Sequence, residues 1–174
     1  MENYLLGTPL TRLALVLVVL LGFLLGGPIA DHLGWNKWAT RLTLWGLGGS
    51  LIPTFVFRIG LFDITWDVRA VNDCLSTIAP SRTDPDSLAN LLLLVPFAVG
   101  LTWASRSGWV GAGGVMLLGL MIEVGQQVTG LGACERGDLV RNIGGGLVAV
   151  GLTSAIRWAR SRPRSATATA PRQP

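Results

Sequence analysis

The chain has 174 residues, of which half are hydrophobic and only 14% are charged, and its mean hydropathy is +0.52. A soluble domain carries about 25% charged residues, so the composition argues against a soluble globular protein. The net charge of +4 does not indicate a nucleic-acid partner, because five of the 14 lysines and arginines lie in the last 18 positions and the rest of the chain has a net charge of about zero. These five residues are Arg157, Arg160, Arg162, Arg164 and Arg172. Beside a membrane, such a patch is typical of a topology signal and of contact with anionic lipid.

Five apolar stretches predict transmembrane helices, because a bilayer core about 30 Å thick requires roughly 20 mostly apolar residues per helix. None shows the polar stripe, repeated every three or four residues, that is typical of soluble helices. We expect an all-α membrane protein with one transmembrane domain over residues 1–160 and a disordered basic cytoplasmic tail over residues 161–174. Pro96 should kink the third span. The spans cover about residues 10–29, 42–59, 88–104, 109–129 and 139–159.

The first apolar stretch has the alternative reading of a cleaved signal peptide. Its leading segment, MENYLLGTPLTR, has no net positive charge, and its apolar run is long. The sequence GGPIAD is a poor cleavage site. We therefore expect this stretch to be retained as the first helix of the bundle.

The charges between the apolar stretches predict their orientation. Residues 30–41 have a net charge of +1, the third turn carries Arg106 and the tail adds +5, whereas residues 58–86 and 130–138 have net charges of −2 and −1. Five spans place the positive segments on one side, which should be the cytoplasm, so the N-terminus is expected outside and the C-terminus in the cytoplasm. Six tryptophans should lie at the same inner boundary, where indole rings are favoured: Trp35, Trp38, Trp45, Trp103, Trp109 and Trp158.

The two cysteines, Cys74 and Cys134, fall in the two acidic loops, both predicted to lie outside, where disulfides are permitted. A bridge between them would stabilise the fold by roughly 4 kcal/mol on the chain-entropy model. Two unpaired thiols are the alternative, because sequence does not give their separation. Their spacing does not indicate zinc, and the single histidine, His32, lies on the cytoplasmic side. We expect no metal site and no cofactor.

Two predicted helices begin with the same pattern, D-x-x-x-N. Asp86 and Asn90 open the third span, and Asp138 and Asn142 open the fifth. A spacing of four places each aspartate above its asparagine on one helical face, and the two pairs should lie at similar depth. Each aspartate has the alternative role of capping its helix and complementing the helix dipole. The asparagines, about 6 Å into the bilayer by helical rise, indicate function more strongly.

Glu123 is the strongest single signal, because it is the charged residue deepest within any predicted span. It precedes the end of the fourth span by six residues, or about 9 Å, and an ionisable residue at that depth indicates a functional site by default. Gln126 and Gln127 follow at three and four residues and can share its face. The alternative is a buried glutamate that locks the bundle through hydrogen bonds. Three arginines near the same boundary are candidate counter-charges: Arg58, Arg136 and Arg141.

Small residues recur at the spacing of helix contacts, which in lipid allows helix backbones to approach closely. The run Gly144-Gly145-Gly146 is therefore expected to be a packing surface, since it lacks the strand and lysine of a phosphate-binding loop. The pairs are Gly22 and Gly26, Gly46 and Ser50, Gly145 and Ala149, and Gly151 and Ala155.

The polar positions taken together resemble the VanZ-like family of bacterial membrane proteins. The resemblance begins with Asp86 and Asn90 before the helix LLLLVPFAVGL, and continues with MIEVGQQ, in which Glu123 and Gln126 have the family's E-x-x-Q arrangement. It ends with a D-x-x-x-N-x-x-G pattern that starts at Asp138 and runs into IGGGL. The matched region covers about residues 58–157, although the acidic run before Asp138 is thinner than in many relatives. The resemblance implies a site formed by Asp86, Asn90, Glu123, Gln126, Arg136, Asp138 and Asn142.

The resemblance also implies a protein of the bacterial plasma membrane and cell envelope, because the namesake contributes to resistance to the lipoglycopeptide teicoplanin. The leading hypothesis is a protein, not an enzyme, that binds a lipid-linked peptidoglycan precursor or a glycopeptide in an outer-leaflet polar cavity, with membrane lipids as further partners. One alternative is an intramembrane enzyme that modifies a lipid head group with Glu123 as general acid or base. A second alternative is a structural envelope-assembly factor. A transporter is disfavoured because no polar path crosses the inner halves of the helices.

Overall fold

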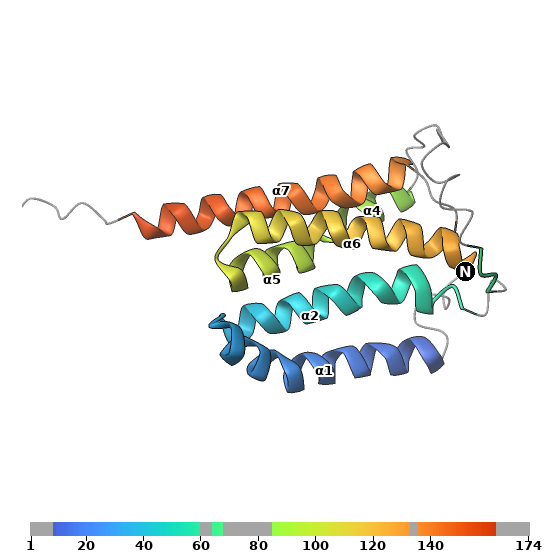
Figure 1. The fold of residues 1–174 in the computed structure, drawn as a ribbon, viewed down its shortest axis with the longest axis horizontal. Helices are drawn as coiled ribbons and strands as arrows, with labels where there is room; N and C mark the ends of the chain where they lie inside the picture. The colour runs from blue at the N-terminus through green and yellow to red at the C-terminus, as the bar shows by residue number, and fades with distance from the viewer. Residues whose placement is uncertain (1–8, 60–63, 68–84, 133–135, 163–174) are drawn as a thin grey trace, which may run out of the picture.

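A computed structural model describes residues 9–59, 64–67, 85–132 and 136–162. Within these ranges the chain forms helices and no β-strand, and consecutive segments run in alternating directions along one axis (Figure 1). The elements are α1 (Pro9–Leu33), α2 (Lys37–Leu51), the π-helical turn η1 (Ile52–Val56), α4 (Pro85–Leu93), α5 (Val95–Ser105), α6 (Gly108–Thr129) and α7 (Arg136–Ser161).

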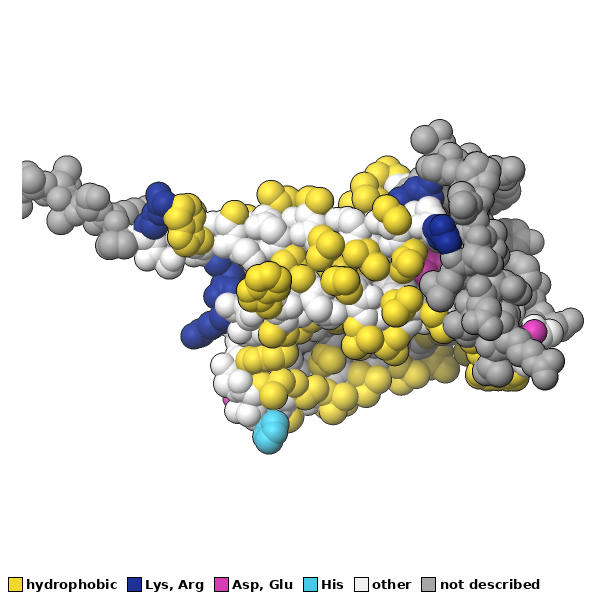
Figure 2. Space-filling view, turned by 45° about the horizontal axis from the view of Figure 1, so that its top comes forward, with side chains coloured by type: hydrophobic (Ala, Val, Ile, Leu, Met, Phe, Trp, Pro, Cys, Tyr) yellow, Lys and Arg dark blue, Asp and Glu magenta, His cyan; other side chains and the backbone are white. Residues whose placement is uncertain are grey.

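Four helical segments are long and apolar enough to cross a membrane: Pro9–Leu33, Leu88–Ser105, Gly108–Thr129 and Arg136–Ser161. In the remaining segment, α2 has 15 residues and η1 adds five, so the two together reach the length of a span. Large apolar side chains are exposed along the flanks of the bundle, whereas several hydroxyls and amides are buried inside it (Figure 2). The protein is therefore an all-α membrane protein with a helical bundle, as the sequence predicted.

The helix ends differ from the apolar stretches because caps, and not hydropathy, end a helix. The predicted loop over residues 30–41 is largely helical, and α1 continues to Leu33. Gly34 then adopts a positive φ of 66°, a left-handed conformation that glycine adopts readily. The side chain of Asn36 accepts a hydrogen bond from the Ala39 backbone N–H at 3.0 Å and starts α2 five residues before the predicted span.

Two prolines interrupt the second and third spans. Proline has no N–H and its ring clashes with the preceding turn of a helix. The predicted kink at Pro96 is confirmed: α4 ends at Leu93 and α5 begins at Val95, with the proline in its first turn. Pro53 stands at the start of η1, where the α-helical pattern of α2 gives way to a π-helical turn. This second interruption was not predicted, and it lies next to the candidate site.

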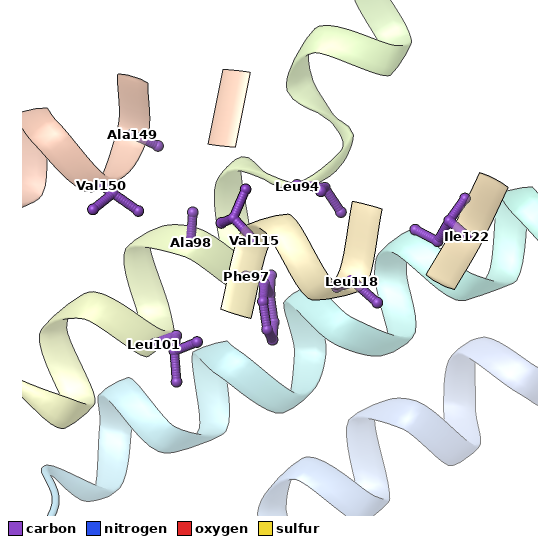
Figure 3. Close-up of a cluster of buried hydrophobic side chains, with 9 residues drawn as sticks. All are labelled: Leu94, Phe97, Ala98, Leu101, Val115, Leu118, Ile122, Ala149 and Val150. Carbon is purple, nitrogen blue, oxygen red and sulfur yellow. The ribbon is translucent and has the colours of Figure 1, made fainter. Parts of the chain in front are cut away.

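The apolar core lies between α5, α6 and α7, with Leu94 at the junction between α4 and α5 (Figure 3). The two halves of the third span have different neighbours, since α5 packs against α2 while α4 packs against α7. The most peripheral helix is α1, which packs on α2 and η1. The core side chains are Leu94, Phe97, Ala98, Leu101, Val115, Leu118, Ile122, Ala149 and Val150.

Glycines form the closest helix contacts. A Cβ at Gly46 would meet the backbone of Phe97, and one at Gly145 would meet the carbonyl oxygen of Leu91. The close backbone contacts that the pairs at Gly46 and Gly145 predict are therefore present, whereas the α1 pair accommodates α2 side chains, since a Cβ at Gly22 would meet Trp45 and one at Gly26 would meet Arg41. The pair at Gly151 is different, because a Cβ there would meet nothing within 4 Å. That pair faces away from the bundle, since close packing requires a partner helix and not only a spacing.

The two ends of the bundle carry different side chains. The α1–α2 turn, the α5–α6 turn and the end of α7 lie together at one end (Figure 1). At this end arginines lie over aromatic rings, with Arg41 4.8 Å from the Trp38 ring centroid and Arg162 3.6 Å from that of Trp158. Such pairs suit the boundary between lipid and water. Cys74 and Cys134, for which the sequence allows either a bridge or two free thiols, and the tail beyond residue 162 lie outside the described residues.

Candidate functional site

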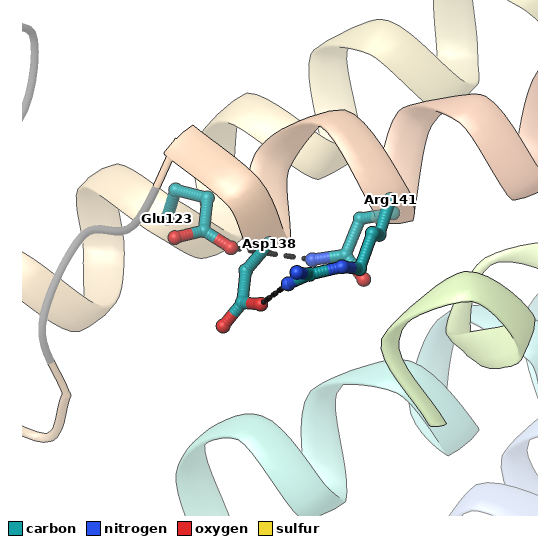
Figure 4. A network of polar contacts seen from close by, with 4 residues as sticks. Glu123, Asp138 and Arg141 are labelled. Atoms are coloured by element: carbon teal, nitrogen blue, oxygen red, sulfur yellow. Dashed lines mark hydrogen bonds and ion pairs between the residues drawn. The ribbon is translucent and has the colours of Figure 1, made fainter. Parts of the chain in front are cut away.

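The centre of the candidate site is a hydrogen bond between α6 and α7. Asn142 donates from Nδ2 to Oε1 of Glu123 at 3.2 Å, and each residue is only 2% exposed (Figure 4). Glu123 lies six residues before the end of α6, and Asn142 lies six residues after the start of α7. Because the two helices run in opposite directions, equal offsets bring the two side chains to the same depth. The carboxylate is thus buried in the bundle and does not face the surrounding lipid.

Only one of the two polar atoms of the Asn142 side-chain amide has a hydrogen-bond partner within the described residues. Its Oδ1 atom is buried and accepts no hydrogen bond from any residue that the structure describes. A buried amide oxygen without a donor is unfavourable by about 1–3 kcal/mol. Glu123 has a further interaction besides the bond to Asn142. The unsatisfied atom of the pair is therefore Oδ1 of Asn142, which is a hydrogen-bond acceptor. The position therefore suits a group that donates a hydrogen bond, such as a peptide N–H or a sugar hydroxyl.

Gln126 is brought to the same region but contacts a different element. It is 6% exposed, and its Nε2 donates a long hydrogen bond of 3.5 Å to the backbone carbonyl of Thr54 in η1. The hydroxyl of Thr54 donates in turn to the Ser50 carbonyl at 2.7 Å. The π-helical turn thus supplies a main-chain acceptor to the face that Glu123 and Gln126 share. Thr54 was missed at the sequence level, and the usable signal was Pro53, because a proline inside a span alters the backbone bonds around it.

Charged side chains lie beside the Glu123–Asn142 pair at the start of α7. Asp138 and Arg141 form an ion pair of 2.8 Å in which both side chains are partly exposed (Figure 4). Asp138 also lies in the first turn of α7, where a negative charge complements the helix dipole. Arg136 is the first residue of α7 and is exposed. These groups form a charged rim above a buried polar pair.

The remaining predicted residues are on α4. Asn90 is half-buried, and its side chain makes no hydrogen bond within the described part of the chain. Asp86 lies in the first turn of the same helix, and its side chain is not among those described. The nearby carbonyl of Leu91 lies against Gly145 on α7. The structure therefore brings α4 to the flank of the site without an amide contact to Glu123 or Asn142.

The loop-side end of α6 is covered by backbone. The Thr65 N–H donates to the Thr129 carbonyl at 3.1 Å, and the Asp67 N–H donates to the Val128 carbonyl at 3.0 Å. Arg58 donates to the Leu131 carbonyl at 3.0 Å. These bonds satisfy carbonyls that a helix end leaves unpaired. They also hold the chain after α6 beside Gln126, since a Cβ at Gly132 would lie 3.4 Å from the Gln126 side chain.

No group of three or more potential metal-ligating side chains occurs within the described ranges. The carboxylates, amides and guanidinium groups that are present suit hydrogen bonding to a polar organic group, and Arg136 and Arg141 suit a phosphate or carboxylate. A comparison of the chain with protein-family models, with curated proteins and with solved structures finds no match.

Proposed function

We propose that this chain is a VanZ-like cell-envelope protein of the bacterial plasma membrane that binds the head group of an amphiphile at the Glu123–Asn142 pair. The amphiphile is a lipid-linked peptidoglycan precursor or a lipoglycopeptide of the teicoplanin type. The observation that carries the proposal is the buried Oδ1 atom of Asn142, which has no donor and lies beside a buried carboxylate under a charged rim. Both classes of amphiphile offer peptide N–H groups and sugar hydroxyls as donors.

The unpaired oxygen of the Asn142 amide favours ligand binding over a purely structural role, in which the Glu123–Asn142 bond only joins α6 to α7. A lock between two helices gains most when both ends of the amide are paired, since an unsatisfied buried acceptor offsets the bond that is made. Here the Nδ2 atom is paired and the Oδ1 atom is not. A head group that donates to Oδ1 would complete the network, while Arg141 or Arg136 would pair with its phosphate or carboxylate.

Binding is favoured over ion transport by the distribution of buried charge. Glu123 is the one charged side chain among the fully buried residues that the structure describes. Towards the other end of the bundle, the buried polar groups are threonine hydroxyls, including those of Thr40, Thr43 and Thr102. A carboxylate near one end, without further ionisable groups along the axis, suits a site that opens to one leaflet.

Substitution of Glu123 by Ala tests the proposal. We expect binding of a purified lipid-linked precursor and of teicoplanin to weaken about 10- to 100-fold, because a hydrogen bond to a charged group contributes about 1.5–3 kcal/mol. Teicoplanin susceptibility should increase when protein levels are matched. Separate binding measurements with the precursor and with teicoplanin decide between the two ligands.

Thr102→Val is the matched control, because Thr102 is fully buried on α5 and its hydroxyl has no partner within the described residues. It should leave both measurements unchanged. Glu123→Gln separates charge from hydrogen bonding. Unchanged binding of both ligands and unchanged susceptibility in Glu123→Ala, at equal protein level, would show that the proposal is wrong.

A further inference from the structure

A groove opens on the flank of the bundle between α2 and the third span. It has a volume of about 350 Å³ and is lined almost entirely by carbon. Trp45, Gly46 and Gly49 line its α2 wall, and Ala89, Leu92 and Pro96 line its opposite wall. Ala89 and Pro96 are seven helical steps apart, which corresponds to about 10 Å along the helix axis. The groove therefore runs parallel to the helices and lies within the depth of the hydrocarbon core.

The Pro96 kink accounts for the groove. On the C-terminal side of the kink, the backbones of α5 and α2 are in close contact, because Gly46 faces Phe97 and Gly100 faces Thr43. On the N-terminal side of the kink, α4 packs on α7 and has at most marginal contact with α2. The third span thus changes its neighbour at Leu94, and the space that it leaves beside α2 is the groove.

The walls of the groove are held in place. The Trp45 indole donates to the Val19 carbonyl of α1 at 3.2 Å, and its ring meets that of Phe23 edge-on with centroids 5.1 Å apart. Gly49 is different, since a Cβ there would meet nothing within 4 Å. A side chain at position 49 would therefore extend into the groove without displacing another helix.

The groove walls connect to the candidate site through neighbouring residues of the same helices. On α4, Ala89 in the groove wall directly precedes Asn90. On α2, Gly49 in the opposite wall directly precedes Ser50, whose carbonyl accepts a hydrogen bond from the Thr54 hydroxyl. The Thr54 carbonyl in turn accepts a hydrogen bond from Gln126. The loop-side end of α6 is covered by residues 64–67 and by the Arg58 contact to Leu131. The opening that the structure describes on this part of the bundle is therefore on its flank, which faces the bilayer.

We infer that the groove between α2 and the α4–α5 span holds the polyprenyl chain of a lipid-linked precursor whose head group binds at Glu123 and Asn142. This inference rests on the proposed function and adds the position of the chain. A lipid tail gains little hydrophobic free energy on moving from the bilayer into an apolar groove, so the groove acts through shape and packing. The groove holds the chain of an amphiphile whose head group binds at Glu123 and Asn142, and it thereby orients that head group.

The test uses two diazirine-bearing probes, a polyprenyl phosphate and a fatty acid, with the full-length protein in lipid nanodiscs. Photolabelling by the polyprenyl phosphate should fall on the α2 and α4–α5 walls. Gly49→Leu should reduce it about tenfold, which corresponds to about 1.4 kcal/mol. Gly113→Leu on α6 is the matched control, because a Cβ at Gly113 also meets nothing within 4 Å and lies outside the groove. It should leave the labelling unchanged.

The outcomes separate this inference from the proposed function. If Glu123→Ala abolishes precursor binding while Gly49→Leu changes nothing, the function stands and the groove inference is wrong. If Gly49→Leu blocks labelling by the polyprenyl phosphate while Glu123→Ala leaves precursor binding intact, the groove is a chain site and the function is wrong. Equal labelling by both probes indicates ordinary bilayer lipid, and a cross-linked dimer through the groove indicates a second copy of the chain. Each of these two results overturns the inference.

Discussion

At the residue scale, the candidate site depends on two side chains that are expensive to bury separately. An ionisable group inside a membrane needs a partner, and Asn142 supplies one to Glu123 across the α6–α7 contact. The depth of both residues followed from the sequence, because depth depends only on the number of residues from the end of each helix. The similar asparagine on α4, Asn90, has the same local pattern, but its side chain makes no hydrogen bond within the described chain. The local spacing thus identified α4 and α7 as the two helices that carry a candidate asparagine. It did not distinguish which of the two asparagines donates a hydrogen bond to Glu123.

Asn142→Leu tests this asymmetry. The substitution conserves approximate volume but removes the donor to the Glu123 carboxylate, so we expect the free energy of unfolding to fall by about 1–2 kcal/mol. Asn90→Leu is the control and should change it by less than about 0.5 kcal/mol. Equilibrium unfolding in mixed micelles measures both values. Equal losses in the two variants would contradict the assigned hydrogen bond.

At the element scale, helix contacts depend on which glycine of a run faces a partner. The three consecutive glycines of α7 have different surroundings: Gly144 faces open space, Gly145 faces the Leu91 carbonyl and Gly146 faces Val115. The sequence indicated a packing surface at this run, and the structure contains one. The partner helix was not predictable, because the pattern on α7 is the same whether α4 or α5 lies against it.

Comparison of Gly145→Ala with Gly144→Ala tests the α4–α7 contact. Alanine favours a helix over glycine by about 1 kcal/mol in both positions. Only the Cβ at position 145 would meet backbone, which cannot move away as a flexible side chain can. We expect Gly145→Ala to lower the free energy of unfolding by about 1–3 kcal/mol and Gly144→Ala to raise it or leave it unchanged.

The readout for this pair is the midpoint of thermal unfolding in detergent, with the amount of folded protein checked by gel filtration. Shifts of the same sign and size in the two variants would mean that α4 does not pack on α7 at this glycine.

At the scale of the whole molecule, the bundle has one end with arginines over tryptophans and one end with the buried carboxylate. Arg160, for example, lies 5.5 Å from the Trp103 ring centroid, and Arg157 donates to the Thr102 carbonyl at 3.2 Å. Positive charge is favoured on the cytoplasmic side of membrane proteins. We therefore predict that the C-terminus is cytoplasmic and that the Glu123 site opens towards the outer leaflet.

Reporter fusions test this orientation. Green fluorescent protein attached after Pro174 should fluoresce, and alkaline phosphatase at the same position should be inactive. Phosphatase inserted between Gly132 and Arg136, before the start of α7, should be active. Replacement of the five arginines of the last 18 residues by glutamine should weaken the preference, because these residues supply most of the positive charge on that side. An active phosphatase at the C-terminus would reverse the assigned orientation.

The sequence by itself determined that the chain is a helical membrane protein, that the third span bends at Pro96 and that Glu123 and Asn142 lie at matching depth. Each of these follows from properties that a segment carries alone: apolar length, a missing N–H and a number of residues from a helix end. Only the tertiary structure decided that Asn142 and not Asn90 meets Glu123, that η1 offers the Thr54 carbonyl to Gln126 and that α4 leaves α2 to form a groove. These features depend on which helix faces which, and in lipid that choice is made by close packing between surfaces of similar polarity.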